Sequence, residues 1–247
     1  TVLRRCRAAH NGCVCYHESV SSVQRSEKSS MRIIQGATPQ TETEELANSI
    51  THGVGLVLSI VGWIALMVLA TLFGDGWHLL SCGIYGGTLV FLYGASTCYH
   101  SARKRRSKRV LRIIDHVAIF LLIAGTYTPF TMIFLRDGGG WLLLALVWSL
   151  AVIGLLFKIF SRRRFHWSTT TLYVLMGWLS VLFIEPMLQA IPLGAMLWLV
   201  AGGLAYTVGI IFYGWHGLPY SHAIWHVFVL VGSITHYCAV LFYVVPW

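Results

Sequence analysis

Three histidines and one aspartate in this chain carry the side chains that a metal centre or a hydrolytic site requires. His222 and His226 are one helical turn apart, so a helix would present both imidazoles on one face. His100 ends one apolar stretch of the sequence, and Asp115 lies near the start of the next. Whether these side chains meet depends on how the apolar stretches are arranged.

The composition is that of an integral membrane protein. Hydrophobic residues make up 56% of the 247 residues and charged residues only 11%, whereas a soluble domain contains about 25% charged residues. Several apolar runs are long enough for helices of about 20 residues, the length that crosses a bilayer. The runs are residues 52–73, 78–100, 113–135, 140–160, 167–185, 191–213 and 220–244. We therefore predict an all-α fold, a bundle of seven transmembrane helices.

The connections between these runs are short and leave no room for a second folded domain. Residues 1–45 are polar and lack a sustained apolar period, which predicts a disordered cytoplasmic tail. Residues 46–247 are predicted to form the transmembrane domain. Within it, the basic run 101–112 is expected to be a connection, and Glu185-Pro186 is expected to end a helix.

The basic residues predict the orientation of the bundle. If the segments alternate, all of the 18 Lys and Arg residues except Arg136 fall on one side, in the tail, in run 101–112 and in residues 158–164. Lys and Arg favour the cytoplasmic side, so we expect the N-terminus inside and the C-terminus outside the cell membrane, as in a bacterial inner membrane. This rim would also attract anionic headgroups of membrane lipids. Nucleic-acid binding is disfavoured, because the basic runs carry no interleaved aromatic residues.

With this topology, the candidate site residues all lie within a turn or two of the inner membrane surface. Zinc suits a set of three imidazoles, from His100, His222 and His226, with an open fourth position. A water bound there can lose its proton near neutral pH. Asp115 could orient or deprotonate that water, or bind the metal itself. Ser96 lies one helical turn before His100 and could donate a hydrogen bond.

Other histidines weaken or limit this interpretation. Histidines are common near this side of the membrane, so those named above could instead be interfacial or packed in the core.

Asn48, Thr51 and His52 lie at the right depth to support a site. His236 follows His226 by ten residues, which is about 15 Å along a helix and too far to bind the same ion. We expect it to pair with another helix or to serve a proton path.

Four sequence motifs occur in an order that is similar to that of a known family. They are Glu45-Leu-Ala-Asn-Ser-Ile-Thr-His-Gly-Val-Gly55, Ser96-Thr-Cys-Tyr-His100, Asp115-His-Val-Ala-Ile119 running into Ala124-Gly-Thr-Tyr-Thr-Pro129, and His222-Ala-Ile-Trp-His226. Together they resemble the hemolysin III family, the bacterial branch of the progestin and adipoQ receptor group. The resemblance covers residues 44–247.

The resemblance implies a seven-helix bundle with a cytoplasmic N-terminus and a zinc site near the cytoplasmic face. On the matching positions, His100, His222 and His226 would be the zinc ligands. Asp115 would contact the metal through water, with Ser96 beside it.

The resemblance also implies several possible functions. The wider superfamily includes alkaline ceramidases, which resemble membrane amidases with a similar zinc centre. Animal members are discussed as receptors with latent lipid amidase activity, and the bacterial branch is linked to haemolysis and to membrane-lipid homeostasis. Our leading hypothesis is a zinc-dependent hydrolase of a lipid amide or ester, with Asp115 and Ser96 as catalytic residues. The alternative is a non-enzymatic receptor-like or pore-forming protein with structural zinc.

Overall fold

The structure is a computed structural model that describes residues 2–9, 12–19, 40–160, 166–215 and 217–246. The chain divides into two units, residues 1–39 and 40–247. In the first unit, β1 (Val2–Ala9) and β2 (Gly12–Ser19) pair as an antiparallel hairpin. The disorder expected for the tail stays a prediction, because residues 20–39 lie outside the described part of the chain.

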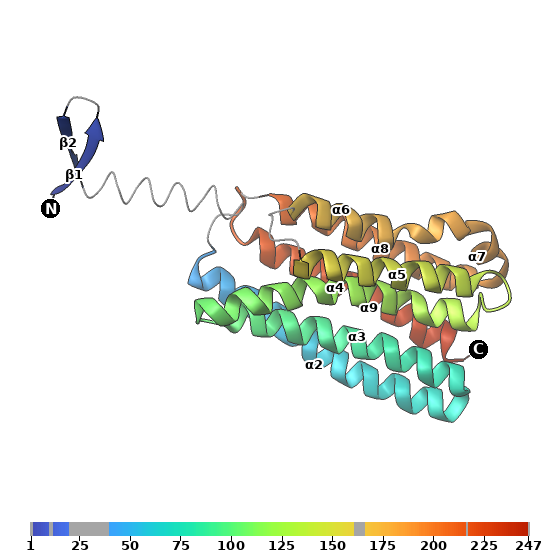
Figure 1. The fold of residues 1–247 in the computed structure, drawn as a ribbon. Coiled ribbons are helices and arrows are strands. Elements are labelled where there is room, and N and C mark those ends of the chain that lie inside the picture. Colours follow the sequence, from blue (N-terminus) through green and yellow to red (C-terminus); the bar gives the residue numbers. More distant parts are fainter. Residues whose placement is uncertain (1, 10–11, 20–39, 161–165, 216, 247) are drawn as a thin grey trace. The chain divides into compact units, whose positions relative to one another are not determined.

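The second unit is a bundle of long helices that run side by side (Figure 1). Its elements are α2 (Glu42–Phe73), α3 (Gly76–Ser101), α4 (Arg105–Ile133), α5 (Gly140–Phe160), α6 (His166–Gly177), η1 (Leu179–Phe183), α7 (Ile184–Ala190), α8 (Leu193–Gly214), α9 (Ser221–Ala239) and η2 (Val240–Val244). Seven spans in the described residues are long and apolar enough to cross a membrane. The predicted seven-helix membrane fold is therefore confirmed.

The first helix of the bundle begins earlier than its apolar run. Thr41 is the N-cap of α2: its hydroxyl accepts a hydrogen bond from the Glu44 N–H at 3.2 Å, and the Glu44 carboxylate accepts one from the Thr41 N–H at 2.8 Å. This capping box gives hydrogen-bond acceptors to two N–H groups at the start of the helix, which have no acceptor within the helix itself. The polar residues after Thr41 are therefore helical and belong to the bundle.

Two stretches that were expected to lie between or at the ends of helices lie inside them. The basic run 101–112 is mostly helical, because α4 begins at Arg105, and Asp115 lies in the third turn of that helix. Glu185 and Pro186 stand in the first turn of α7 and do not end a helix. Proline is tolerated there because N–H groups in the first turn have no partner within the helix.

The fifth span is interrupted in its middle, where α6 gives way to the 3-10 turn η1 and then to α7. The Tyr127 hydroxyl of α4 lies against this break. It contacts the carbonyl oxygens of Met176 and Gly177 at 2.9 and 2.8 Å, and it accepts a hydrogen bond from the Ser180 N–H at 3.1 Å. Irregular backbone at membrane depth is tolerated when a neighbouring helix supplies such partners.

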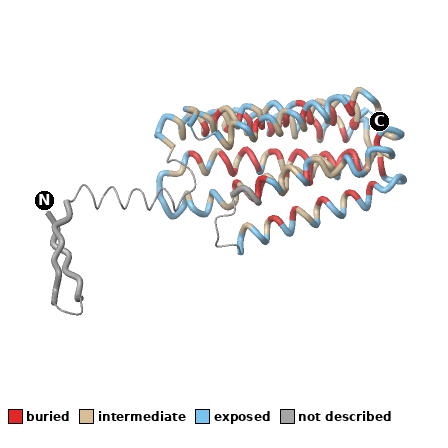
Figure 2. Tube along the Cα trace, turned by 90° about the horizontal axis from the view of Figure 1, so that it is seen from above, coloured by how far each residue is buried: buried red, intermediate tan, exposed pale blue. Residues whose placement is uncertain are grey.

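Many large apolar side chains of the bundle are exposed, and the buried residues lie on the inward sides of the helices (Figure 2). On α2, Leu46, Ile50, Val57 and Ile64 are between 57% and 61% exposed. Such a surface fits a lipid solvent. Inside, helices approach closely at small residues: a Cβ atom on Gly86 of α3 would overlap the indole of Trp63 on α2.

Candidate metal centre

Three histidines from two helices meet at one end of the bundle. His100 stands in the last turn of α3, and His222 and His226 stand in the first two turns of α9. One ring nitrogen from each lies within 4.8 Å of the others. The ring centroids are 5.2 Å apart for His100 and His222, 5.0 Å for His100 and His226, and 4.6 Å for the pair on α9. Their nitrogens are close enough to bind one ion.

The His100 ring is held by a carboxylate from another helix. Its Nδ1 lies 2.8 Å from Oε2 of Glu45 on α2, and its side chain is only 1% exposed. A carboxylate accepts hydrogen bonds, so Nδ1 carries the proton and Nε2 carries a lone pair. Nε2 of His100 is buried and has no hydrogen-bond partner among the described residues.

The His226 ring is oriented in a similar way by Thr51. Its Nδ1 lies 3.3 Å from Thr51 Oγ1, while that hydroxyl donates to the carbonyl oxygens of Ala47 and Asn48 at 3.0 Å. Since the hydroxyl proton is used there, the oxygen is the acceptor and His226 donates from Nδ1. Nε2 of His226 then carries the lone pair. This atom is also buried and has no hydrogen-bond partner among the described residues. Two unpartnered imidazole lone pairs beside a third histidine fit the donor set that zinc prefers.

Asp115 and Ser96 lie beside the histidines. Asp115 is 8% exposed and within electrostatic reach of His100 and Lys158. Its carboxylate is not one of the ligand atoms that approach within 4.8 Å of one another. Ser96, 1% exposed, faces Asp115, but its hydroxyl makes no well-formed hydrogen bond to a described group. Their placement beside the nitrogens suits contact through a water or a substrate.

Two further buried residues of α2 border the cluster. His52 stacks on His226 with ring centroids 3.5 Å apart and planes inclined by 16°. Neither ring nitrogen of His52 has a hydrogen-bond partner among the described residues. Asn48 donates to Gln40 at 2.8 Å, and its Oδ1 has no partner there either. The bundle thus places, around one small region, several polar atoms that have no hydrogen-bond partner among the described residues.

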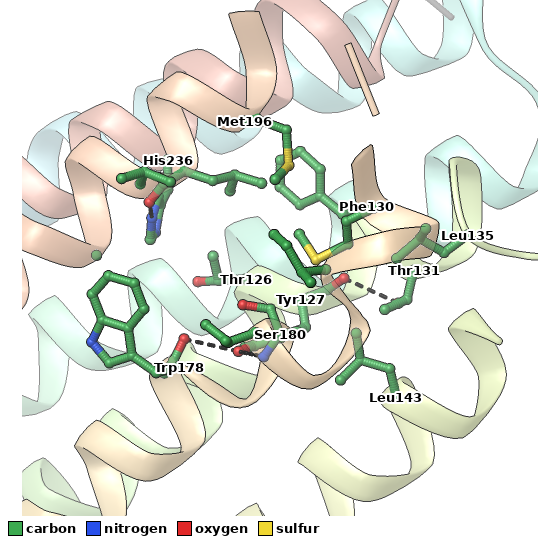
Figure 3. A pocket seen from close by; sticks show the side chains of 17 residues that line it. Thr126, Tyr127, Phe130, Thr131, Leu135, Leu143, Trp178, Ser180, Met196 and His236 are labelled. Atoms are coloured by element: carbon green, nitrogen blue, oxygen red, sulfur yellow. Dashed lines mark hydrogen bonds between the residues drawn. The ribbon is translucent and has the colours of Figure 1, made fainter. Parts of the chain in front are cut away.

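His236 lies away from this region, as its spacing predicts. Its Nε2 lies 3.1 Å from the carbonyl oxygen of Leu199 on α8, so the expected pairing with another helix is confirmed. It borders a cavity of about 120 Å³ that is otherwise lined mainly by apolar side chains such as Phe130, Leu143 and Met196 (Figure 3). No other histidine, aspartate or glutamate lines this cavity in the described chain.

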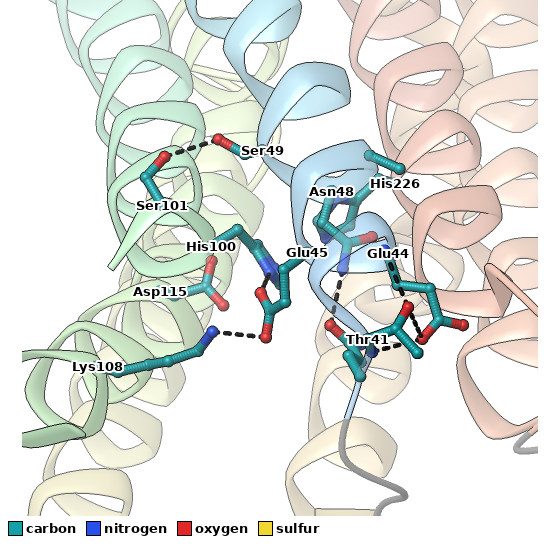
Figure 4. Close-up of polar contacts among 12 residues, drawn as sticks. Thr41, Glu44, Glu45, Asn48, Ser49, His100, Ser101, Lys108, Asp115 and His226 are labelled. Carbon is teal, nitrogen blue, oxygen red and sulfur yellow. Dashed lines mark hydrogen bonds and ion pairs between the residues drawn. The ribbon is translucent and has the colours of Figure 1, made fainter. Parts of the chain in front are cut away.

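Sequence reasoning missed Glu45 and Lys108. Glu45 lies between His100 and the ammonium group of Lys108, which contacts its other carboxylate oxygen (Figure 4). One signal was present, because Glu45, Asn48 and His52 recur at helical spacing and share one face of α2. That stripe of polar residues in an otherwise apolar helix indicates a face turned towards a polar interior.

Comparisons with known proteins agree with the resemblance. A family model described as Haemolysin-III related matches residues 40–237. The chain is 46% identical over 203 residues to Hemolysin-3 of Bacillus cereus, covering 82% of this chain and 93% of that protein. It is 45% identical over 205 residues to the Hemolysin-3 homolog of Bacillus subtilis (strain 168), covering 83% and 96%. Human monocyte to macrophage differentiation factor is 29% identical over 209 residues, covering 80% and 83%. No solved structure matches the chain.

Proposed function

The chain belongs to the haemolysin-III related family and is a multi-pass protein of the cell membrane, and from this premise we propose that it is a zinc-dependent lipid hydrolase. Its substrate is an amide or ester of a membrane lipid. The observation that carries the proposal is the convergence of His100, His222 and His226. The Nε2 atoms of His100 and His226, which no described residue contacts by a hydrogen bond, supply metal ligands, and Asp115 beside them supplies an acid-base group.

Each residue has a distinct part in the proposed reaction. Zinc held by the three histidines would supply a Lewis acid and an activated water. Asp115 accepts the proton of the attacking water and then passes it to the leaving amine or alcohol. Ser96 donates a hydrogen bond to the carbonyl oxygen as negative charge develops on it.

The distribution of charge supports a site at the cytoplasmic face. Lys108 contacts Glu45 beside the histidines, so the basic first turns of α4 lie at the same end of the bundle as the cluster. Lys and Arg favour the cytoplasmic side of a membrane. The exposed Arg105, Arg106 and Arg109 then attract anionic lipid headgroups to that face.

Lipid-amide turnover by the purified protein tests this proposal. Wild type should hold about one zinc ion per chain and should release fatty acid from ceramide in mixed micelles. His222→Ala should lose both the metal and the turnover. Turnover that survives this substitution would overturn the proposal.

A second candidate is a receptor-like or pore-forming protein in which zinc is structural. It is favoured by the name of the Bacillus cereus relative, Hemolysin-3, and by the position of the histidines, which join the ends of α3 and α9. This candidate predicts that His100→Ala lowers the thermal midpoint in detergent, with no hydrolytic activity to lose. Leakage of dye from liposomes with wild type would favour the pore.

A further inference from the structure

The first turns of α2 bind the helices that form the proposed metal centre. Glu45 contacts His100 at the end of α3 through one carboxylate oxygen and Lys108 at the start of α4 through the other (Figure 4). The neighbouring Glu44 accepts a hydrogen bond at 3.0 Å from the Tyr220 N–H, two residues before His222. Two adjacent acidic side chains thus reach the helices that carry the three histidines.

Glu45 determines which nitrogen of His100 can bind a metal. Its carboxylate accepts a hydrogen bond from Nδ1–H, so the lone pair lies on Nε2, the atom without a hydrogen-bond partner in the described part of the chain. The same hydrogen bond limits rotation of the ring. A carboxylate behind a metal-binding histidine also makes the imidazole a stronger donor to the ion.

Lys108 holds Glu45 in this position. Its ammonium group binds the second carboxylate oxygen and lies 5.4 Å from the centre of the Tyr99 ring. The Glu45 side chain is 21% exposed and Lys108 is 29% exposed. An ion pair this close to solvent adds little stability by itself, so its main effect is on the orientation of Glu45.

We propose that Glu45 is a positioning residue of the metal centre, which sets the tautomer and orientation of His100 for zinc. The proposal rests on the metal site of the proposed function. Glu45 touches neither metal nor substrate and acts through His100. A partner of this kind changes metal affinity by about 10- to 100-fold.

The test is the zinc affinity of the full-length protein in detergent, measured by competition with a chelator. Glu45→Gln keeps an acceptor for Nδ1 but removes the charge, and we expect affinity to fall about 10-fold. Glu45→Leu removes the acceptor as well, and the fall should approach about 100-fold. Glu42→Gln is the matched control, because Glu42 is an exposed residue in the same helical turn and should leave affinity unchanged.

A purely structural role for Glu45 predicts a different result. The thermal midpoint of the metal-free protein would then fall in Glu45→Leu while zinc affinity stayed at the wild-type value, which would overturn the proposal. A graded loss of affinity with a nearly unchanged metal-free midpoint supports it. Zinc binding that depends on Glu45 without any lipid hydrolysis would overturn the proposed function and leave the positioning role intact. Wild type without zinc would overturn both.

Discussion

Helix α9 carries two buried histidines in contrasting surroundings. His226 and His236 are 1% and 9% exposed, and each has a ring nitrogen without a hydrogen-bond partner in the described chain. Around His226 stand two more imidazoles that can share an ion with it. His236 binds a backbone carbonyl, packs against Gly202 and borders an apolar cavity. An unpartnered buried nitrogen therefore does not define a site by itself, whereas donors converging from different helices do.

The sharpest test of this contrast exchanges each histidine for alanine. We expect His226→Ala to reduce bound zinc from about one ion per chain to a trace, because only two imidazoles remain. His236→Ala should keep the full metal content. Elemental analysis of the purified proteins measures both, and equal zinc loss in the two variants would break the contrast.

Replacing Asp115 by asparagine separates chemistry from metal binding. The amide keeps the size of the side chain but cannot accept a proton, so we expect turnover of a lipid amide to fall by up to about 10⁴-fold. Zinc content should stay at the wild-type level. If zinc disappears from Asp115→Asn, the carboxylate is a ligand and its proposed acid-base role is wrong.

A smaller effect is expected at Ser96. Ser96→Ala removes a hydroxyl that makes no well-formed hydrogen bond to any residue the structure describes, so folding should change little. If this hydroxyl stabilises the oxyanion, kcat should fall about 10²-fold. KM and zinc affinity should stay close to wild type. An unchanged kcat would exclude Ser96 from the reaction.

The smallest effect on the metal centre is expected from His236→Leu. This change removes the hydrogen bond to Leu199 and costs about 1 kcal/mol of stability. Since the position is remote from the cluster, zinc affinity should stay within about twofold of wild type. Isothermal titration with zinc and a thermal melt measure the two quantities on one sample. Loss of zinc affinity here would show that the two regions are coupled.

Much of the fold could be predicted from the sequence because the bilayer imposes it. An uninterrupted apolar run of sufficient length must become a helix that satisfies its own backbone. The starts of α2 and α4 were placed too late, because their first turns are polar and lack the apolar signal. The interruption of the fifth span was not predicted, because no adjacent glycine and proline indicate a helix break there. The break is stabilised by Tyr127, which comes from a distant part of the sequence.

Some parts of the metal centre could likewise be predicted from the sequence, and others could not. The pairing of His222 with His226 follows from helical spacing alone. The approach of His100 to this pair could be predicted only with a topology that brings the ends of α3 and α9 together. The contact of Glu45 with His100 joins residues 55 positions apart and depends on side-chain directions in the packed bundle. Charge and periodicity along one chain do not encode such a contact, although they do show that Glu45 shares a face with His52.

The hydroxyl of Tyr127 has a further consequence for how the chain is made. The carbonyl groups of Met176 and Gly177 at the break in the fifth span are satisfied by a residue of the third span. Ribosomes release the third span first, so Tyr127 is already in the membrane when the broken segment arrives. The order of synthesis thus matches the order in which these two carbonyl groups need their partner.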